Sequence, residues 1–160
     1  MDFLNTTLGK ALITFLISMV PVIELRGGIP YGIATGLNPW VAFAASVLGN
    51  MLPVPFILLF VRKVLNWMKR YPKLARIAEK LEARAAKKSS KVRQSSELVG
   101  LCLFVAIPLP GTGAWTGALV AALMGMRMKR SLPAIFLGVI VAGVLITLAA
   151  TGVKALSFIL

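Results

Sequence analysis

Apolar residues along this chain form two long runs and two shorter, interrupted ones. The long runs cover Pro39 to Val61 and Leu132 to Val153, and each exceeds the roughly 20 residues that a helix needs to cross a hydrocarbon core of about 30 Å. We therefore predict transmembrane helices over these two runs. The first contains Asn50, Pro53 and Pro55, and it is predicted to bend because proline cannot donate the helical hydrogen bond.

The two shorter runs lead into turn-forming sequences. Residues 11–23 precede ELRGGIP, and residues 98–107 precede PLPGTG, after which apolar character resumes as far as residue 126. Neither arm is long enough, at about 1.5 Å per residue, to cross a membrane as a helix. Glycine and proline predict a break in each sequence, with helices restarting near Tyr31 and near Ala114.

Basic residues indicate how the second interrupted run is arranged. Twelve of the 18 Lys and Arg lie between Arg62 and Arg93, and three more follow residue 126 within the next four positions. Positive charge beside apolar segments marks the cytoplasmic side, so both ends of 98–126 should face the cytoplasm. This segment is then a re-entrant hairpin. If 39–61 ends on the same side, the first hairpin, 8–38, enters from the opposite face and the N-terminus is external.

Small residues recur at every fourth position after both breaks. They are Gly28, Gly32 and Gly36 in the first half and Gly113, Gly117, Ala121 and Gly125 in the second. Such stripes let helices approach closely in lipid. Because the stripe follows the same kind of break in halves of opposite predicted orientation, we predict an inverted repeat of re-entrant hairpin plus transmembrane helix.

The predicted fold is an all-α integral membrane protein with a single domain, 1–160. Its first repeat is 8–61 and its second is 98–153, made of hairpin 98–126 and span 132–153. The basic segment between them, 62–97, contains apolar residues at helical spacing, namely Leu74, Ile77, Ala78, Leu81 and Ala85. We expect an amphipathic helix on the inner leaflet that binds anionic lipid headgroups, with a solvated linker as the alternative.

Composition excludes several classes of protein. A hydrophobic fraction of 58% and a mean hydropathy of +0.87 are too apolar for a water-soluble domain of 160 residues. The net charge of +13 does not indicate nucleic-acid binding, because the basic segment carries only Trp67 and Tyr71 as stacking residues.

A chain this small is expected to form a homodimer to enclose a pathway. Residues 11–23 fit a secretory signal poorly and are expected to stay in the mature fold.

No catalytic or metal site is expected. The chain has no histidine and one cysteine, Cys102, and of its five acidic residues only Glu24 lies inside an apolar stretch. Zinc sites, disulfides, metal sites and paired-carboxylate catalysis all need more of these residues. We therefore predict that the protein is not an enzyme and uses no cofactor.

The predicted site lies between the two hairpin tips, around Glu24 and Arg26. Each restarting helix directs roughly half a positive charge at its break, so the site sums to about +1 and favours an anionic group. Arg26 is suited to phosphate or carboxylate. Glu24 could carry a proton, because desolvation favours the neutral acid while Arg26 favours the carboxylate. The alternative is a structural ion pair that holds the hairpin in shape.

Further residues are predicted to bind substrate or couple it to a proton. They are Gly27, Gly28, Pro30, Asn50, Pro108, Pro110, Gly111, Thr112, Gly113, Trp115 and Thr116. For Thr112, capping of the restarting helix is favoured over a substrate contact. Trp115 and Tyr31 line the cavity or lie at an interface, and the pattern does not distinguish the two.

At ELRGGIPYGIATGLNPW, GNMLPVP and IPLPGTGAWTGAL the chain resembles the small multidrug export family, a distant relative of the DedA group of re-entrant-hairpin membrane proteins. The resemblance covers residues 20–60 and 98–150. It implies a multi-pass protein of the bacterial or archaeal inner (cytoplasmic) membrane with two inverted repeats. DedA-type proteins are associated with proton-dependent movement of a lipid phosphate, using acidic residues in the first hairpin and arginines around the second. Glu24 matches the first feature, whereas PLPGTG and its flanks hold no arginine.

These observations predict a secondary transporter of small amphipathic or anionic molecules or lipids, with proton coupling through Glu24. One alternative is an exporter of cationic drugs, which a net positive site disfavours. Another is a non-transporting scaffold that binds anionic lipids through the basic segment 62–97.

Overall fold

The computed structural model describes residues 6–89, 94–109 and 111–156, and the regular structure within them is helical throughout. The helices are α1 (Thr7–Met19), α2 (Glu24–Ala34), α3 (Pro39–Met51), α4 (Pro53–Met68), α5 (Pro72–Ser89), α6 (Gln94–Ala106), α7 (Ala114–Leu123) and α8 (Met128–Leu156). The all-helical prediction is confirmed for these residues.

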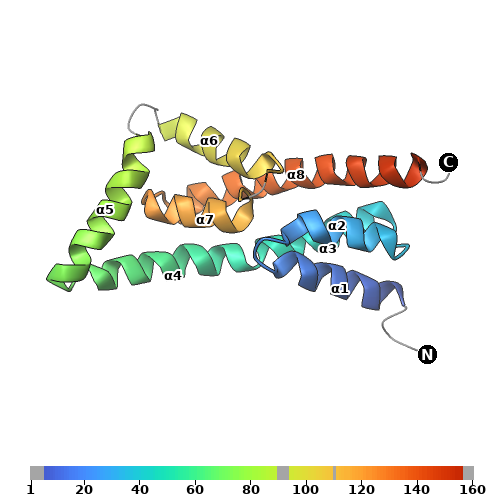
Figure 1. Ribbon diagram of the computed structural model, residues 1–160, viewed down its shortest axis with the longest axis horizontal. Coiled ribbons are helices and arrows are strands. Elements are labelled where there is room, and N and C mark those ends of the chain that lie inside the picture. Colours follow the sequence, from blue (N-terminus) through green and yellow to red (C-terminus); the bar gives the residue numbers. More distant parts are fainter. Residues whose placement is uncertain (1–5, 90–93, 110, 157–160) are drawn as a thin grey trace.

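Two helical hairpins lie end to end along two long helices (Figure 1). The first hairpin, α1 and α2, packs on α3, while the second, α6 and α7, packs on α4 and α8. Their tips turn toward each other near the middle of the molecule, and α5 closes one end (Figure 1). Each hairpin therefore covers only part of the length that α3 and α4 span together.

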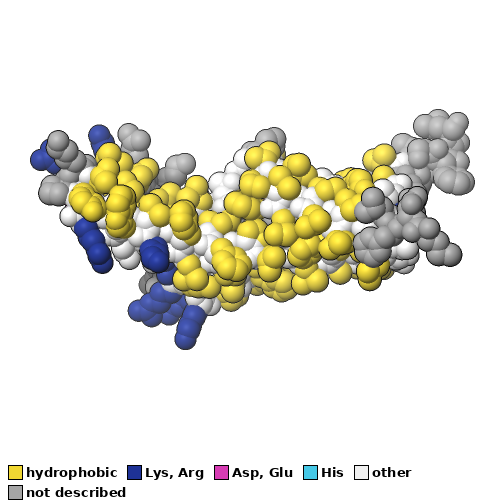
Figure 2. Space-filling view, turned by 90° about the horizontal axis from the view of Figure 1, so that it is seen from below, with side chains coloured by type: hydrophobic (Ala, Val, Ile, Leu, Met, Phe, Trp, Pro, Cys, Tyr) yellow, Lys and Arg dark blue, Asp and Glu magenta, His cyan; other side chains and the backbone are white. Residues whose placement is uncertain are grey.

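The surface is that of a membrane protein. Pro39–Met68 and Met128–Val153 are long and apolar enough to cross a membrane, and only 33% of the most apolar window of each is buried. Large side chains such as Phe56 and Phe60 are exposed, at 67% and 68%. Figure 2 shows hydrophobic side chains over most of the face it displays, with Lys and Arg gathered at one end. Exposed apolar area of this extent needs lipid around it.

Both predicted spans are longer than the apolar runs suggested. The first continues to Met68, and a single residue, Leu52, lies between α3 and α4 with helical backbone angles. Pro53 and Pro55 cannot donate to the carbonyls one turn earlier, so the helical ladder is interrupted there. The second span begins at Met128 instead of Leu132, because the basic residues before Leu132 also join the helix.

The predicted break at ELRGGIP was wrong. The chain turns earlier, between Met19 and Glu24, and α2 starts at Glu24 instead of near Tyr31. Val22 and Glu24 supply the reversal with positive φ angles of 75° and 50°. Pro30 lies inside α2, where it removes one backbone donor, a loss that helices packed in a membrane tolerate.

The glycine stripes have two structural roles. A Cβ at Gly32 would lie 2.8 Å from the Ala42 Cβ, and one at Gly117 would lie 2.5 Å from Val105 Cγ2, so close helix approach is confirmed there. Gly36 and Gly125 instead end α2 and α7 with φ of 88° and 67°. Both ends form the same Schellman cap, through Leu37 N–H to the Gly32 carbonyl and Met126 N–H to the Ala121 carbonyl, each 3.0 Å.

The two halves also pack their first arm on their long helix in the same way. Gly49 of α3 lies against the backbone carbonyl of Phe15 in α1, and Gly138 of α8 lies against that of Cys102 in α6. Each glycine is the eleventh residue of its helix, and each carbonyl belongs to the residue four positions before its helix ends. The halves therefore share one packing plan.

Gly49→Ala is expected to destabilise the protein by about 1–3 kcal/mol, because the added methyl group would overlap the Phe15 carbonyl and force α1 from α3. Gly100→Ala in α6 is the matched control, since open space surrounds that position and alanine favours the helix by about 0.5–1 kcal/mol. Thermal unfolding of the purified protein in detergent should separate the two variants. Equal shifts in Tm would contradict the packing described here.

Candidate functional site

Glu24 joins the first hairpin to the second. Its side chain is 3% exposed, and Oε1 accepts a hydrogen bond from the backbone N–H of Trp115 at 3.1 Å. Trp115 lies in the first turn of α7, where N–H groups have no helical partner and the helix dipole favours negative charge. The Glu24 carboxyl therefore caps the N-terminus of α7 from a different hairpin.

Arg26 binds backbone carbonyl groups at the same tip, whereas Glu24 binds a backbone N–H group. Its guanidinium donates to the carbonyls of Leu109 and Thr112, the latter at 2.8 Å, and to the Thr112 hydroxyl at 2.7 Å. The Thr112 hydroxyl also lies 2.7 Å from the carbonyl of Ile107, to which it can donate. These groups belong to the unwound connection between α6 and α7, where carbonyls lack helical donors. Arg26 therefore stabilises that connection.

The local backbone explains why both charges reach the second tip. Glu24 has a φ of 50° and opens α2, so it and Arg26 lie in the first turn of that helix, which begins where the chain reverses. On the other side, Gly113 has a φ of 132°, which side-chain-bearing residues rarely adopt. A Cβ at Gly113 would overlap the Glu24 carboxylate. Glycine is therefore required there by conformation and by space.

Asn50 adds a buried amide beside these charges. Its side chain is completely buried, and it is a hydrogen-bonding neighbour of the Glu24 carboxyl group. It lines a small pocket together with Glu24, Arg26 and Gly113. The Asn50 amide therefore packs directly among the charged groups at the tip.

An open apolar groove adjoins the site through Trp115. Its volume is about 620 Å³, and its lining includes Met19 at the first tip, Phe56 and Phe60 of α4, and Lys63. The indole of Trp115 also lines this groove, and its Nε1 is buried without a partner. The volume lies within the range of small-molecule sites. One residue thus connects the Glu24 carboxylate to a groove that suits an apolar chain.

Some of the predicted site residues lie close together in the structure. Glu24, Arg26, Asn50, Thr112, Gly113 and Trp115 meet as described. Glu24 and Arg26 each bind the second tip, which differs from the local ion pair considered as the alternative.

The other predicted residues lie apart from this centre. Gly27 packs on the side chain of Ile23, Gly28 faces α1 and α3, and Pro30 lines a separate groove against α8. Pro108 and Gly111 are exposed on the connection, Thr116 is partly buried in α7, and Pro110 lies outside the described residues.

Sequence reasoning missed two sets of residues. The carbonyls of Ile107 and Leu109 carry no signal, because any residue type supplies a carbonyl. Thr14, Ser18 and Ser46 are buried polar side chains. Their spacing was a usable signal, since Thr14 and Ser18 are four positions apart in an apolar run, as are Ser46 and Asn50.

Thr112→Val is expected to destabilise the protein by about 1–3 kcal/mol, because it keeps the side-chain shape but removes the hydroxyl that accepts from Arg26. Thr112→Ser keeps the hydroxyl and should stay near the wild-type Tm. Thermal unfolding in detergent measures both. A valine variant as stable as the serine variant would show that the Arg26 contact contributes nothing.

The family comparison covers both hairpin tips. A family model described as "Putative small multi-drug export protein" matches residues 24–145. The match begins at Glu24 and ends inside α8, so it includes every side chain that joins the tips. No curated protein and no solved structure matches the chain. On the family match, which covers most of its length, the chain belongs to the small multi-drug export protein family.

Proposed function

We propose that this protein is a proton-coupled secondary transporter of small amphipathic anions, lipids included, in the cytoplasmic membrane. The observation that carries the proposal is the position of the Glu24 carboxylate on the N-terminus of α7. This is where an anionic substrate group would bind, so the Glu24 carboxylate takes the place that such a group would occupy.

The arrangement of the hairpins supports entry from both membrane faces. α1 and α2 have 13 and 11 residues, too few for either to span, and their tip meets that of the second hairpin beside the long α3 and α4 (Figure 1). The basic end formed by α5 belongs on the cytoplasmic face. Two re-entrant hairpins of opposite orientation then place Glu24 and Arg26 near the membrane midplane, as inverted-repeat transporters do with their sites.

Protonation of Glu24 would open the site. The ionised carboxylate neutralises the N-terminus of α7 and balances the Arg26 charge. When Glu24 takes up a proton, its hydrogen bond to the Trp115 N–H weakens, because the acceptor is no longer charged. The α7 N–H groups and Arg26 then become available to an anion. The anion replaces the lost carboxylate charge, so the buried charge stays nearly constant during exchange.

The groove favours amphipathic substrates over cationic drugs. Its apolar lining suits an alkyl or aromatic tail, and Lys63 and Arg26 place positive charge at the groove and at the site. A cation would be repelled by Lys63 at the groove, and by Arg26 at the site once Glu24 is protonated. The family description names drugs in general, and the charges here favour the anionic members of that class.

Glu24→Gln is expected to reduce uptake driven by a pH gradient at least about tenfold, because glutamine is close in shape but cannot exchange a proton. Proteoliposomes with an imposed pH gradient and a radiolabelled alkyl phosphate measure the rate, with a lipophilic cation as the comparison substrate. Glu79→Gln on α5 is the control and should transport as the wild type does. Retained pH-gradient coupling in Glu24→Gln would overturn the assignment.

Neutralising exposed positive charges on α5 distinguishes a transporter from a scaffold that only binds lipids. Arg76→Gln with Lys80→Gln should leave the uptake rate within about twofold, since each surface charge contributes only on the order of 1 kcal/mol to lipid attraction. A lipid-binding scaffold would instead show no uptake in the wild type and lose its binding to anionic vesicles in this variant.

A further inference from the structure

A row of buried polar side chains runs through the first hairpin, away from the tip. Thr14 and Ser18 of α1 and Ser46 and Asn50 of α3 are all completely buried. Within each helix the two residues are one turn apart, so each pair lies on one face. The four side chains occupy the interface of α1 and α3 with α2.

The glycine stripe of α2 brings the two pairs together. A Cβ at Gly28 would overlap the Ser18 hydroxyl and would lie 2.8 Å from the Ser46 hydroxyl. One turn on, a Cβ at Gly32 would lie 3.0 Å from the Thr14 hydroxyl. Gly28 and Gly32 also follow Glu24 at intervals of one turn, so the polar row faces the same side of α2 that carries Glu24.

The row has a charged group near each end. At the tip, Asn50 lines the pocket that contains Glu24 and Arg26. At the far end, Lys10 donates to the Thr35 carbonyl at 2.7 Å, and the Thr14 hydroxyl donates to the Lys10 carbonyl at 2.8 Å. Lys10 is partly exposed, so this end reaches the surface of the hairpin.

The Ser46 hydroxyl in the middle of the row lacks a hydrogen-bond partner, although it is fully buried. Leaving a buried group unpaired costs about 1–3 kcal/mol. Bridging water is the usual partner of buried polar groups that protein atoms do not satisfy.

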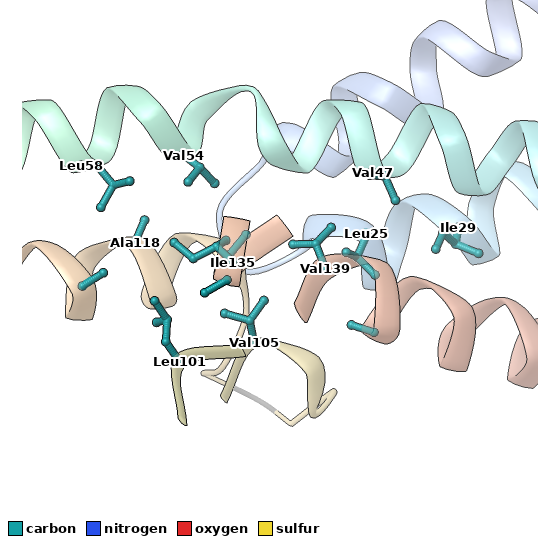
Figure 3. Packing of buried hydrophobic residues seen from close by; sticks show 14 of the residues in the cluster. Leu25, Ile29, Val47, Val54, Leu58, Leu101, Val105, Ala118, Ile135 and Val139 are labelled. Carbon is teal, nitrogen blue, oxygen red and sulfur yellow. The ribbon is translucent and has the colours of Figure 1, made fainter. Parts of the chain in front are cut away.

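The second half shows that the fold does not need polarity here. Aligning Gly49 with Gly138 and Phe15 with Cys102 pairs each polar residue with an aliphatic one. The counterparts of Thr14, Ser18, Ser46 and Asn50 are Leu101, Val105, Ile135 and Val139, all buried. Figure 3 shows Val105, Ile135 and Val139 packed close together. The same helix packing is therefore made once with aliphatic side chains and once with polar ones.

We propose that the polar row is a hydrated proton path from the end of the first hairpin near Lys10 to Glu24. Each hydroxyl or water along the path accepts one proton and passes on another, so the net change is one proton gained by the Glu24 carboxylate. The aliphatic second half seals the opposite side. The inference rests on the proposed proton coupling, and it adds the face from which the proton arrives.

Thiol accessibility tests the path without a transport assay. Cys102 is the single cysteine of the chain, so a Cys102→Ser background allows one thiol to be placed at a time. Ser18→Cys and Ser46→Cys report on the row, and Val105→Cys and Ile135→Cys are their counterparts in the second half. The probe is silver ion added to the protein in lipid vesicles, with thiols that remain free counted by mass spectrometry after denaturation and alkylation.

The serine-derived thiols should react at least about tenfold faster than the counterparts, because a thiol forms the reactive thiolate only where water reaches it. Two positions in the row guard against one variant failing to fold, which size-exclusion elution and Tm reveal. Folded Ser18→Cys and Ser46→Cys proteins that react as slowly as Ile135→Cys would overturn the path, as would equal fast reaction of all four.

The outcomes for path and transport are separable. Unreactive thiols in a protein that still shows pH-driven uptake would reject the path and leave the proposed function standing. If the thiols react but the protein shows no pH-driven uptake, the row is hydrated and the proposed proton coupling is wrong.

Discussion

Unpaired backbone groups at the tip of the second hairpin are the constraint on which the rest of the structure depends. The connection between α6 and α7 leaves carbonyls without helical donors and the N-terminus of α7 without helical acceptors. At the proposed position inside the membrane no water would replace those partners, and an unsatisfied group there would cost several kcal/mol. Glu24 satisfies the N–H side and Arg26 the carbonyl side, and both come from the other hairpin.

This arrangement combines the structural and the functional roles of the two charges. A local ion pair would have left both charges inside their own hairpin, with no effect on the second. Because each charge binds the opposite tip, a change in the protonation of Glu24 alters the contact between the two halves directly. In the proposed transport cycle, the contact that joins the two hairpins is then the one that protonation of Glu24 weakens.

The halves share a packing plan but differ in chemistry. Their glycine contacts and helix caps correspond position by position, whereas the side chains buried beside them are polar in the first half and aliphatic in the second. Repetition accounts for the shape of the molecule. The difference between the repeats is the basis of the proposed proton path, because the buried polar row lies in the first half.

The sequence by itself determined the features that depend on local pattern. Hydropathy located the two long apolar helices, Pro53 and Pro55 marked the interruption between α3 and α4, and the four-residue spacing predicted close helix contacts. These succeed because helix period and proline geometry act within one turn of the chain.

Only the tertiary structure decided which groups meet. Arg26 and Thr112 are 86 residues apart, and no local rule pairs a guanidinium with carbonyls that any residue could supply. ELRGGIP has the composition of a break but forms a helix, because Gly28 and Gly32 pack α2 against α1 and α3. Packing between the hairpins therefore set both the position of the turn and the composition of the site.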